Sequence, residues 1–143
     1  MTKAAPRHPR GVLDTSAVIL LPSLPAADLL PDEPLITTIT LAELSVGPLV
    51  ATDPAERAAR QAHLQQAEAD FTPLPFDAAA ARAFGRVAAS LRGGGRKRAA
   101  RSFDAMIAAI AIANRLPLYT ANPADFEGID GLEVVKVTAA RGT

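Results

Sequence analysis

SFDAMIAAIAIAN, residues Ser102 to Asn114, is the stretch around which the rest of the chain is organised. One acidic residue, Asp104, precedes nine consecutive apolar residues, Ala105 to Ala113. A helix that is apolar on all sides has no face for water, so this pattern predicts a helix in the interior of a globular protein, too short to cross a bilayer. Ser102 is a suitable N-cap, which would place Asp104 in the first turn. There the backbone N–H groups and the helix dipole would keep its carboxylate ionised.

The composition indicates one globular domain. The chain has 143 residues, 49% of them hydrophobic, which suffices for one core. We expect a loose basic tail over residues 1–10 and a single domain over residues 11–143. Fifteen Lys and Arg balance fifteen Asp and Glu, so attraction to nucleic acid has to come from a local patch. The chain lacks cysteine and a signal-peptide pattern, which predicts a cytoplasmic protein with no membrane association.

Short apolar segments alternate with helical segments along the chain. The composition of buried strands is found at residues 11–13, 35–38, 71–74, 117–120 and 132–137. Further helices are predicted between these strands, at residues 41–49, 54–70 and 77–91. This alternation is typical of an α/β domain in which helices cover both faces of a central parallel sheet. The sequence therefore predicts a three-layer α/β/α fold.

Acidic residues follow the first two predicted strands. Asp14 comes directly after residues 11–13, where a turn or helix cap is expected. Glu43 comes shortly after the second strand and completes Thr40-Leu-Ala-Glu, the S/T-x-x-E pattern of a capping box. Taken alone, each acid therefore has a structural role as a helix cap.

A third such acid, Asp125, follows the strand at residues 117–120, with Asn122 as a candidate cap and Pro123 at the first helical position. In a parallel α/β sheet, active groups collect beyond the carboxyl ends of the strands. Asp104, on the buried helix, can pack against the same edge. Either these acids only cap their own helices, or they meet in one site.

Carboxylates that meet repel one another unless a cation neutralises them. The candidate ligands are all oxygen atoms, because the chain has no cysteine and neither His8 nor His63 has a partner at ligand spacing. This donor set favours a hard ion, Mg²⁺ or Mn²⁺, over zinc. Such an ion activates water and stabilises the leaving oxygen when a phosphodiester is hydrolysed.

A basic segment precedes the buried helix. Residues 92–101 hold five of the fifteen basic residues, and three of the others are glycines, Gly93 to Gly95. Two interpretations remain open: a solvated loop, or a flexible flap that binds RNA phosphates. The candidate RNA-binding residues are Arg96, Lys97, Arg98 and Arg101.

Four motifs occur in order along the chain: LDTSA (residues 13–17), TLAEL (40–44), FDAMIAAIA (103–111) and YTANPADF (119–126). Together they resemble the PIN-domain family, particularly the VapC-type toxins of bacterial toxin–antitoxin pairs. The resemblance extends from Gly11 to Val137. It implies a compact α/β/α fold and a Mg²⁺- or Mn²⁺-dependent ribonuclease, usually a homodimer, inhibited by a cognate antitoxin that occupies its cleft.

The resemblance also implies roles for individual residues. The family's catalytic, metal-binding acids are matched by Asp14, Glu43, Asp104 and Asp125. Polar positions that support the acids or the bound water are matched by Thr15 or Ser16, Thr120 and Asn122. The resemblance does not select an RNA, because relatives cut different transfer or ribosomal RNAs.

Two other functions are alternatives to a ribonuclease toxin. The first is a catalytically inactive PIN-like interaction module, and the presence of all four acids argues against it. The second is another Mg²⁺ enzyme, an aspartyl-phosphate phosphatase or a receiver domain. The first strand ends in the single acid Asp14, without the D-x-D of such phosphatases or the paired acids of receivers. We therefore expect a metal-dependent endoribonuclease.

Overall fold

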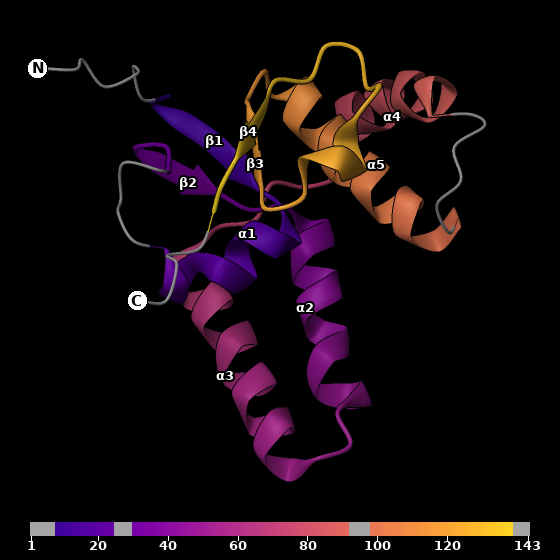
Figure 1. Ribbon diagram of the computed structural model, residues 1–143. Coiled ribbons are helices and arrows are strands. Elements are labelled where there is room, and N and C mark those ends of the chain that lie inside the picture. Colours follow the sequence, from indigo (N-terminus) through magenta and orange to yellow (C-terminus); the bar gives the residue numbers. More distant parts are fainter. Residues whose placement is uncertain (1–7, 25–29, 92–97, 139–143) are drawn as a thin grey trace, which may run out of the picture.

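The computed structural model describes residues 8–24, 30–91 and 98–138, and within these ranges it contains one four-stranded sheet (Figure 1). Its strands, in the spatial order β2-β1-β3-β4, are β1 (Arg10–Leu13), β2 (Glu33–Leu35), β3 (Leu118–Thr120) and β4 (Val134–Lys136). Every neighbouring pair of strands is parallel. The predicted central parallel sheet is confirmed.

Helices cover this sheet on two sides (Figure 1). The α-helices are α1 (Thr15–Leu20), α2 (Thr38–Val50), α3 (Pro54–Asp70), α4 (Ala78–Ser90) and α5 (Arg98–Ala113), and two 3₁₀ helices are η1 (Leu21–Ser23) and η3 (Pro123–Phe126). Within the described ranges, no helix is both long and apolar enough to cross a membrane.

Two apolar cores lie on opposite faces of the sheet, because successive strand residues point to opposite sides. Val12 and Leu118 pack with buried residues of α4 and α5. The residues that follow them, Leu13 and Tyr119, pack with buried residues of α1 and α3. Each core therefore joins the middle strands to one layer of helices, which confirms the three-layer α/β/α arrangement.

Helix α5 is the interior helix that its sequence predicts. Residues 108–111 are completely buried, and the nearby Ile107 is 1% exposed. The predicted start of the helix is wrong, however: α5 begins at Arg98, so Ser102 is not its N-cap and Asp104 lies in the second turn. Because the influence of a helix dipole falls off within the first turn, the dipole does not hold the charge of Asp104.

Other boundaries also differ from the sequence predictions. Strand β2 begins and ends earlier than residues 35–38, and the segment 71–74 is not a full strand. Instead, Thr37 and Leu74 form an isolated parallel bridge. Arg10 already belongs to β1, and the carbonyl of His8 accepts from the backbone of Asp32, so the expected tail does not reach residue 10. Residues 1–7 lie outside the described ranges.

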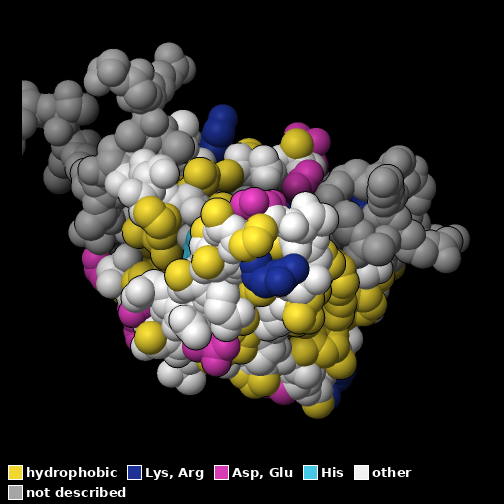
Figure 2. Space-filling view, turned by 90° about the horizontal axis from the view of Figure 1, so that it is seen from below, with side chains coloured by type: hydrophobic (Ala, Val, Ile, Leu, Met, Phe, Trp, Pro, Cys, Tyr) yellow, Lys and Arg dark blue, Asp and Glu magenta, His cyan; other side chains and the backbone are white. Residues whose placement is uncertain are grey.

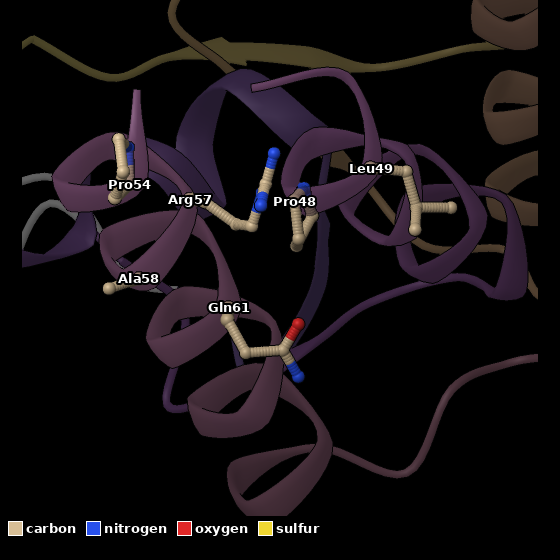
Figure 3. Close-up of a pocket in the computed structure, with 6 residues that line it drawn as sticks. All are labelled: Pro48, Leu49, Pro54, Arg57, Ala58 and Gln61. Carbon is tan, nitrogen blue, oxygen red and sulfur yellow. The ribbon is translucent and has the colours of Figure 1, made fainter. Parts of the chain in front are cut away.

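Helices α2 and α3 form a hairpin whose far end is closed by arginines. Arg57 Nη2 donates to the Ala51 carbonyl, and Arg60 Nη1 donates to the Gly47 carbonyl, both at 3.0 Å. These contacts satisfy carbonyls at the end of α2 that have no partner within the helix. Figure 3 shows Arg57 directed between the two helices, where it borders a hollow of about 530 Å³. The hollow is lined by Pro48, Leu49, Pro54, Arg57, Ala58 and Gln61, and none of the four candidate acids borders it.

Candidate active site

Asp14 is fixed at the carboxyl end of the sheet. The β1–β3 register pairs Leu13 with Tyr119, so Asp14, directly after β1, lies beside Thr120, the last residue of β3. Asp14 is 5% exposed and caps α1, with Oδ1 accepting from the Ala17 backbone N at 2.9 Å and from Ser16 Oγ at 2.7 Å. Its other oxygen, Oδ2, accepts from Thr120 Oγ1 at 2.5 Å. Both carboxylate oxygens are therefore held in place.

Glu43 is not part of a capping box, which corrects the interpretation of the Thr40–Glu43 pattern. Helix α2 begins at Thr38, and its N-cap is Thr37, whose Oγ1 accepts from the Thr40 backbone N at 3.1 Å. Glu43 therefore lies beyond the first turn of α2. Its Oε1 accepts a 2.6 Å hydrogen bond from Oγ1 of Thr15, which is the first residue of α1. Glu43 therefore does not serve as a helix cap, and capping does not explain its presence.

Neighbouring charges link the four acids. Burial raises the pKa of Glu43, the Thr15 hydrogen bond opposes the increase, and the charges of Asp104 and Asp14 raise this pKa further. Burial likewise raises the pKa of Asp14 against its hydrogen bonds, and the charge of Asp125 adds to the increase. The charge of Asp104 on α5 thus acts on Glu43, the charge of Asp125 in η3 acts on Asp14, and the charge of Asp14 acts on Glu43.

The donor set of this acid cluster, Asp14, Glu43, Asp104 and Asp125, suits a hard divalent cation. All of its ligand atoms are carboxylate oxygens, and the repulsion among them would be relieved by positive charge. As the side chains stand, no three acid or histidine residues among those described are arranged to hold one ion. Ligation by three of the acids therefore requires at least one of them to change rotamer.

The supporting polar residues occupy different places around the acids. Thr15 contacts Glu43, whereas Ser16 and Thr120 contact Asp14. Asn122 acts through its backbone: its N donates to Thr120 Oγ1 at 3.0 Å, and its side chain does not cap η3. Pro123 does occupy the first position of η3, as predicted.

Sequence reasoning missed Thr40 as a residue near the site. Its side chain is completely buried, and its Oγ1 lies 3.0 Å from Thr15 Oγ1 in a hydrogen bond. The TLAEL motif contains the signal, since Thr40 precedes Glu43 by one helical turn. The capping-box interpretation assigned Thr40 as a helix cap and therefore did not predict its contact with Thr15.

The basic segment is described only at its end. Arg96 and Lys97 lie outside the described residues, and Arg98 is the first residue of α5. Arg101 Nη1 donates to the Leu91 carbonyl at 2.8 Å, just past the end of α4. This contact gives Arg101 a structural role, and phosphate binding by the segment stays a prediction.

Comparisons with known proteins identify the family to which this fold belongs. The PIN domain family model matches residues 11–132. The match includes β1 from Gly11 onward, all of β3, and the four candidate acids. The chain belongs to the PIN domain family.

Individual relatives agree with this assignment. The chain is 41% identical to Ribonuclease VapC5 of Mycobacterium tuberculosis (strain ATCC 25618 / H37Rv) over 129 residues, which are 89% of this chain and 93% of that protein. Its structure is similar to that of VapBC-5, a member of the VapBC family of toxin-antitoxin systems from Mycobacterium tuberculosis, with a TM-score of 0.76, 40% identity, and coverage of 90% of this chain and 99% of the other. The DNA-bound VapBC of Salmonella typhimurium gives a TM-score of 0.70 at 25% identity, covering 87% and 96% of the two chains.

Proposed function

We propose that this protein is a metal-dependent endoribonuclease that acts as the toxin of a toxin–antitoxin pair. The observation that carries the proposal is a pair of oriented carboxylates at the carboxyl end of the sheet: the buried Asp14, held by Thr120 and Ser16, and Glu43, held by Thr15. The charges of Asp125 and Asp104 act on this pair. The 41% identity to Ribonuclease VapC5 supports RNA as the substrate. Hydrolysis of a phosphodiester bond, with water as the nucleophile, is the reaction to which such a cluster is suited.

Each residue of the site has a defined task in this reaction. Asp14, Glu43, Asp104 and Asp125 would hold Mg²⁺ or Mn²⁺ through their carboxylate oxygens. When bound, the ion would activate a water molecule and stabilise the leaving oxygen. Thr120 and Ser16 keep Asp14 in place, and Thr15 does so for Glu43. These hydrogen bonds orient the carboxylates in advance, so fewer groups need to be ordered when a phosphate arrives.

The decisive test compares RNA cleavage by the purified protein with Mg²⁺, with Mn²⁺ and with EDTA. Cleavage is expected with either ion and is expected to stop in EDTA. Asp104→Asn, purified in the same way, is the matched control, because a contaminating nuclease would survive this substitution. Equal cleavage by both proteins would contradict the proposal and favour a catalytically inactive interaction module.

We further propose that Arg96, Lys97 and Arg98 bind the phosphates of the RNA. Cationic side chains that contact phosphates release counterions, so affinity depends on salt. Replacing these residues with glutamine should reduce the slope of log affinity against log salt by about 0.7 for each lost contact with single-stranded RNA. The matched control is Arg115→Gln, at an exposed position beyond the end of α5. An unchanged slope would show that the segment does not contact RNA.

A protein partner is proposed for the apolar surface. Figure 2 shows apolar side chains gathered on the face seen from the α2–α3 end, and Val46, Leu49 and Phe103 are among the exposed ones. A groove of about 360 Å³ between α1 and α3, lined in part by Val18 and Ala62, is a second apolar surface. We infer that an antitoxin covers the groove and that a homodimer forms through the exposed face. Co-expression of a cognate antitoxin should restore growth and suppress cleavage together, and light scattering should give the mass of a dimer.

A further inference from the structure

We propose that the hollow between α2 and α3 is a docking site for a partner peptide that presents an apolar side chain beside a carboxylate. The hollow is the space of about 530 Å³ at the far end of the helix hairpin (Figure 3). None of the four candidate acids borders it, so this site is separate from the acid cluster. Docking there is independent of the proposed nuclease activity.

Most of the wall of the hollow is apolar. Pro48 and Leu49 come from α2, and Pro54 and Ala58 come from α3. Leu49, which also belongs to the exposed apolar face, is 83% exposed, and the neighbouring Val50 is 61% exposed. Contiguous apolar side chains in contact with water mark surfaces that bind a partner. An apolar side chain placed between the two helices would remove this surface from water.

The walls of the hollow are also rigid. Pro48 and Pro54 each have a fixed φ angle. Arg57 Nη2 donates to the Ala51 carbonyl at 3.0 Å, and Arg60 donates to a second carbonyl near the end of α2, so the two helices are held together. A ligand therefore meets a surface that is already formed, and fewer groups have to be ordered when it binds.

The positive charge in the hollow belongs to Arg57. Among the residues that the structure describes, no carboxylate forms an ion pair with it. The two acids nearest to it in the sequence are engaged elsewhere: Asp53 accepts from the Glu56 backbone N, and the Glu56 carboxylate pairs with Arg60. A guanidinium has several N–H donors, and the bond to Ala51 uses one of them. The hollow is therefore complementary to a carboxylate.

The composition of the lining favours a peptide over a nucleic acid. Besides Arg57, the described residues that line the hollow include one polar side chain, Gln61, which reaches from α3 toward α2 (Figure 3). Phosphates along an RNA backbone bind to several cations, and proline, leucine and alanine side chains offer them no donor. A peptide matches both parts of the hollow, because its apolar side chain can contact the prolines while its carboxylate reaches Arg57.

The experiment titrates the isotope-labelled full chain with two peptides in EDTA. They are acetyl-Ala-Leu-Glu-Leu-Ala-amide and the same peptide with glutamine in place of glutamate, which differ in charge and hardly in shape. The amide signals of Leu49, Ala58 and Gln61 should shift in NMR spectra with both peptides. The glutamate peptide should bind about two- to fivefold more tightly, the range for an exposed ion pair.

Two pairs of variants locate the binding. Arg57→Gln should bind both peptides equally. Its matched control is Arg60→Gln, because Arg60 also donates to an α2 carbonyl but does not line the hollow, and this variant should retain the preference for glutamate. Ala58→Leu should fill part of the hollow and weaken both peptides. Ala69→Leu, at an exposed position of α3 outside the hollow, should bind them as the wild type does.

Several outcomes would overturn the proposal. They are equal affinity of the wild type for the two peptides, a preference for glutamate that survives in Arg57→Gln, and undiminished binding by Ala58→Leu. An absence of shifts with either peptide, as expected if a second copy of the chain covers the hollow, would also overturn it. Hexauridine that shifts the same signals more than the glutamate peptide would assign the hollow to RNA instead. A wild type without nuclease activity would overturn the proposed function and leave these measurements as expected.

Discussion

Asp14 and Glu43 are two acids of one cluster that the fold holds in different ways. Asp14 sits at the end of a buried strand and accepts hydrogen bonds from Ser16, Ala17 and Thr120, which together occupy both of its oxygens. Glu43 extends from a helix and, within the described part of the chain, accepts one hydrogen bond, from Thr15. The sheet thus supplies a fixed carboxylate, and α2 supplies an adjustable one.

The difference explains how the cluster can lack a ready-made ion site and still suit a cation. No three acids among the described residues are arranged around one point. Asp14 is anchored by its neighbours, so we expect the rotamer change to involve Glu43, whose side chain is longer and is held through one oxygen. The comparison therefore predicts that Asp14 sets the position of the site and Glu43 completes it.

The largest expected effect is the loss of cleavage in Asp14→Asn. Asparagine caps a helix as well as aspartate does, so the fold should persist. Removing a charged ligand should lower the cleavage rate by more than about 100-fold, the upper range for residues that merely support a ligand. The measurement is single-turnover cleavage of RNA together with a circular dichroism spectrum. A folded Asp14→Asn variant with near wild-type activity would show that Asp14 is not required for cleavage.

The second effect is stabilisation of the wild type by Mg²⁺. At a free concentration of 100 times the dissociation constant, binding should raise the free energy of unfolding by about 2.7 kcal/mol. Denaturant titrations with Mg²⁺ and with EDTA give this difference. Asp104→Asn, which removes one proposed ligand, should gain less. Equal gains in the two proteins would indicate that the ion binds elsewhere.

The third effect is a change in pH dependence caused by Glu43→Gln in EDTA. Burial first, and then the charges of Asp104 and Asp14, raise the pKa of Glu43 in the folded protein. A raised pKa means that the contribution of Glu43 to stability is present below its unfolded pKa and is lost as the pH rises through its folded pKa. At pH 7 the variant should therefore melt at a higher temperature than the wild type, and the two should converge below about pH 4, near the ordinary range of a glutamate. A lower melting temperature at pH 7 would contradict the coupling of the acids.

The smallest effect is expected for an acid that serves only as a cap. Asp77 is exposed, and its Oδ1 accepts from the Ala80 backbone N at 3.0 Å at the start of α4. Asp77→Ala should cost about 1 kcal/mol of stability and leave RNA cleavage unchanged. Asp77→Asn, which retains the cap, should be neutral in both measurements. Reduced cleavage in both variants would mean that the acid cluster is wider than proposed.

Much of the fold could be predicted from local patterns. The apolar run after Asp104 indicated a buried helix because nothing on that segment can face water. Helix α3 begins at Pro54 and ends at Asp70, as predicted, since Asp53 and Pro54 form a clear start signal. Helix α4 begins at Ala78, one residue after the predicted start, because Asp77 caps it.

Predictions failed where two local signals competed. Thr40 and Glu43 fit a capping box, yet Thr37 caps α2, because the backbone leaves the sheet beside Leu74 and begins the helix earlier. Ser102 fits an N-cap, yet α5 continues back to Arg98, because alanine and arginine are good helix formers. In both cases the sequence was compatible with two different first residues for the helix.

The sequence by itself determined the buried helix after Asp104, the helices α3 and α4, and that Asp14 follows a buried strand, since each of these depends on the spacing of neighbouring residues. Only the tertiary structure decided which polar groups meet. The β1–β3 register brings Thr120 to Asp14 across 106 positions, and the packing of α1 on α2 brings Thr15 to Glu43 and Thr40. Hydrogen bonds act over about 3 Å, so partners far apart in the chain exist only once the strands and helices have packed.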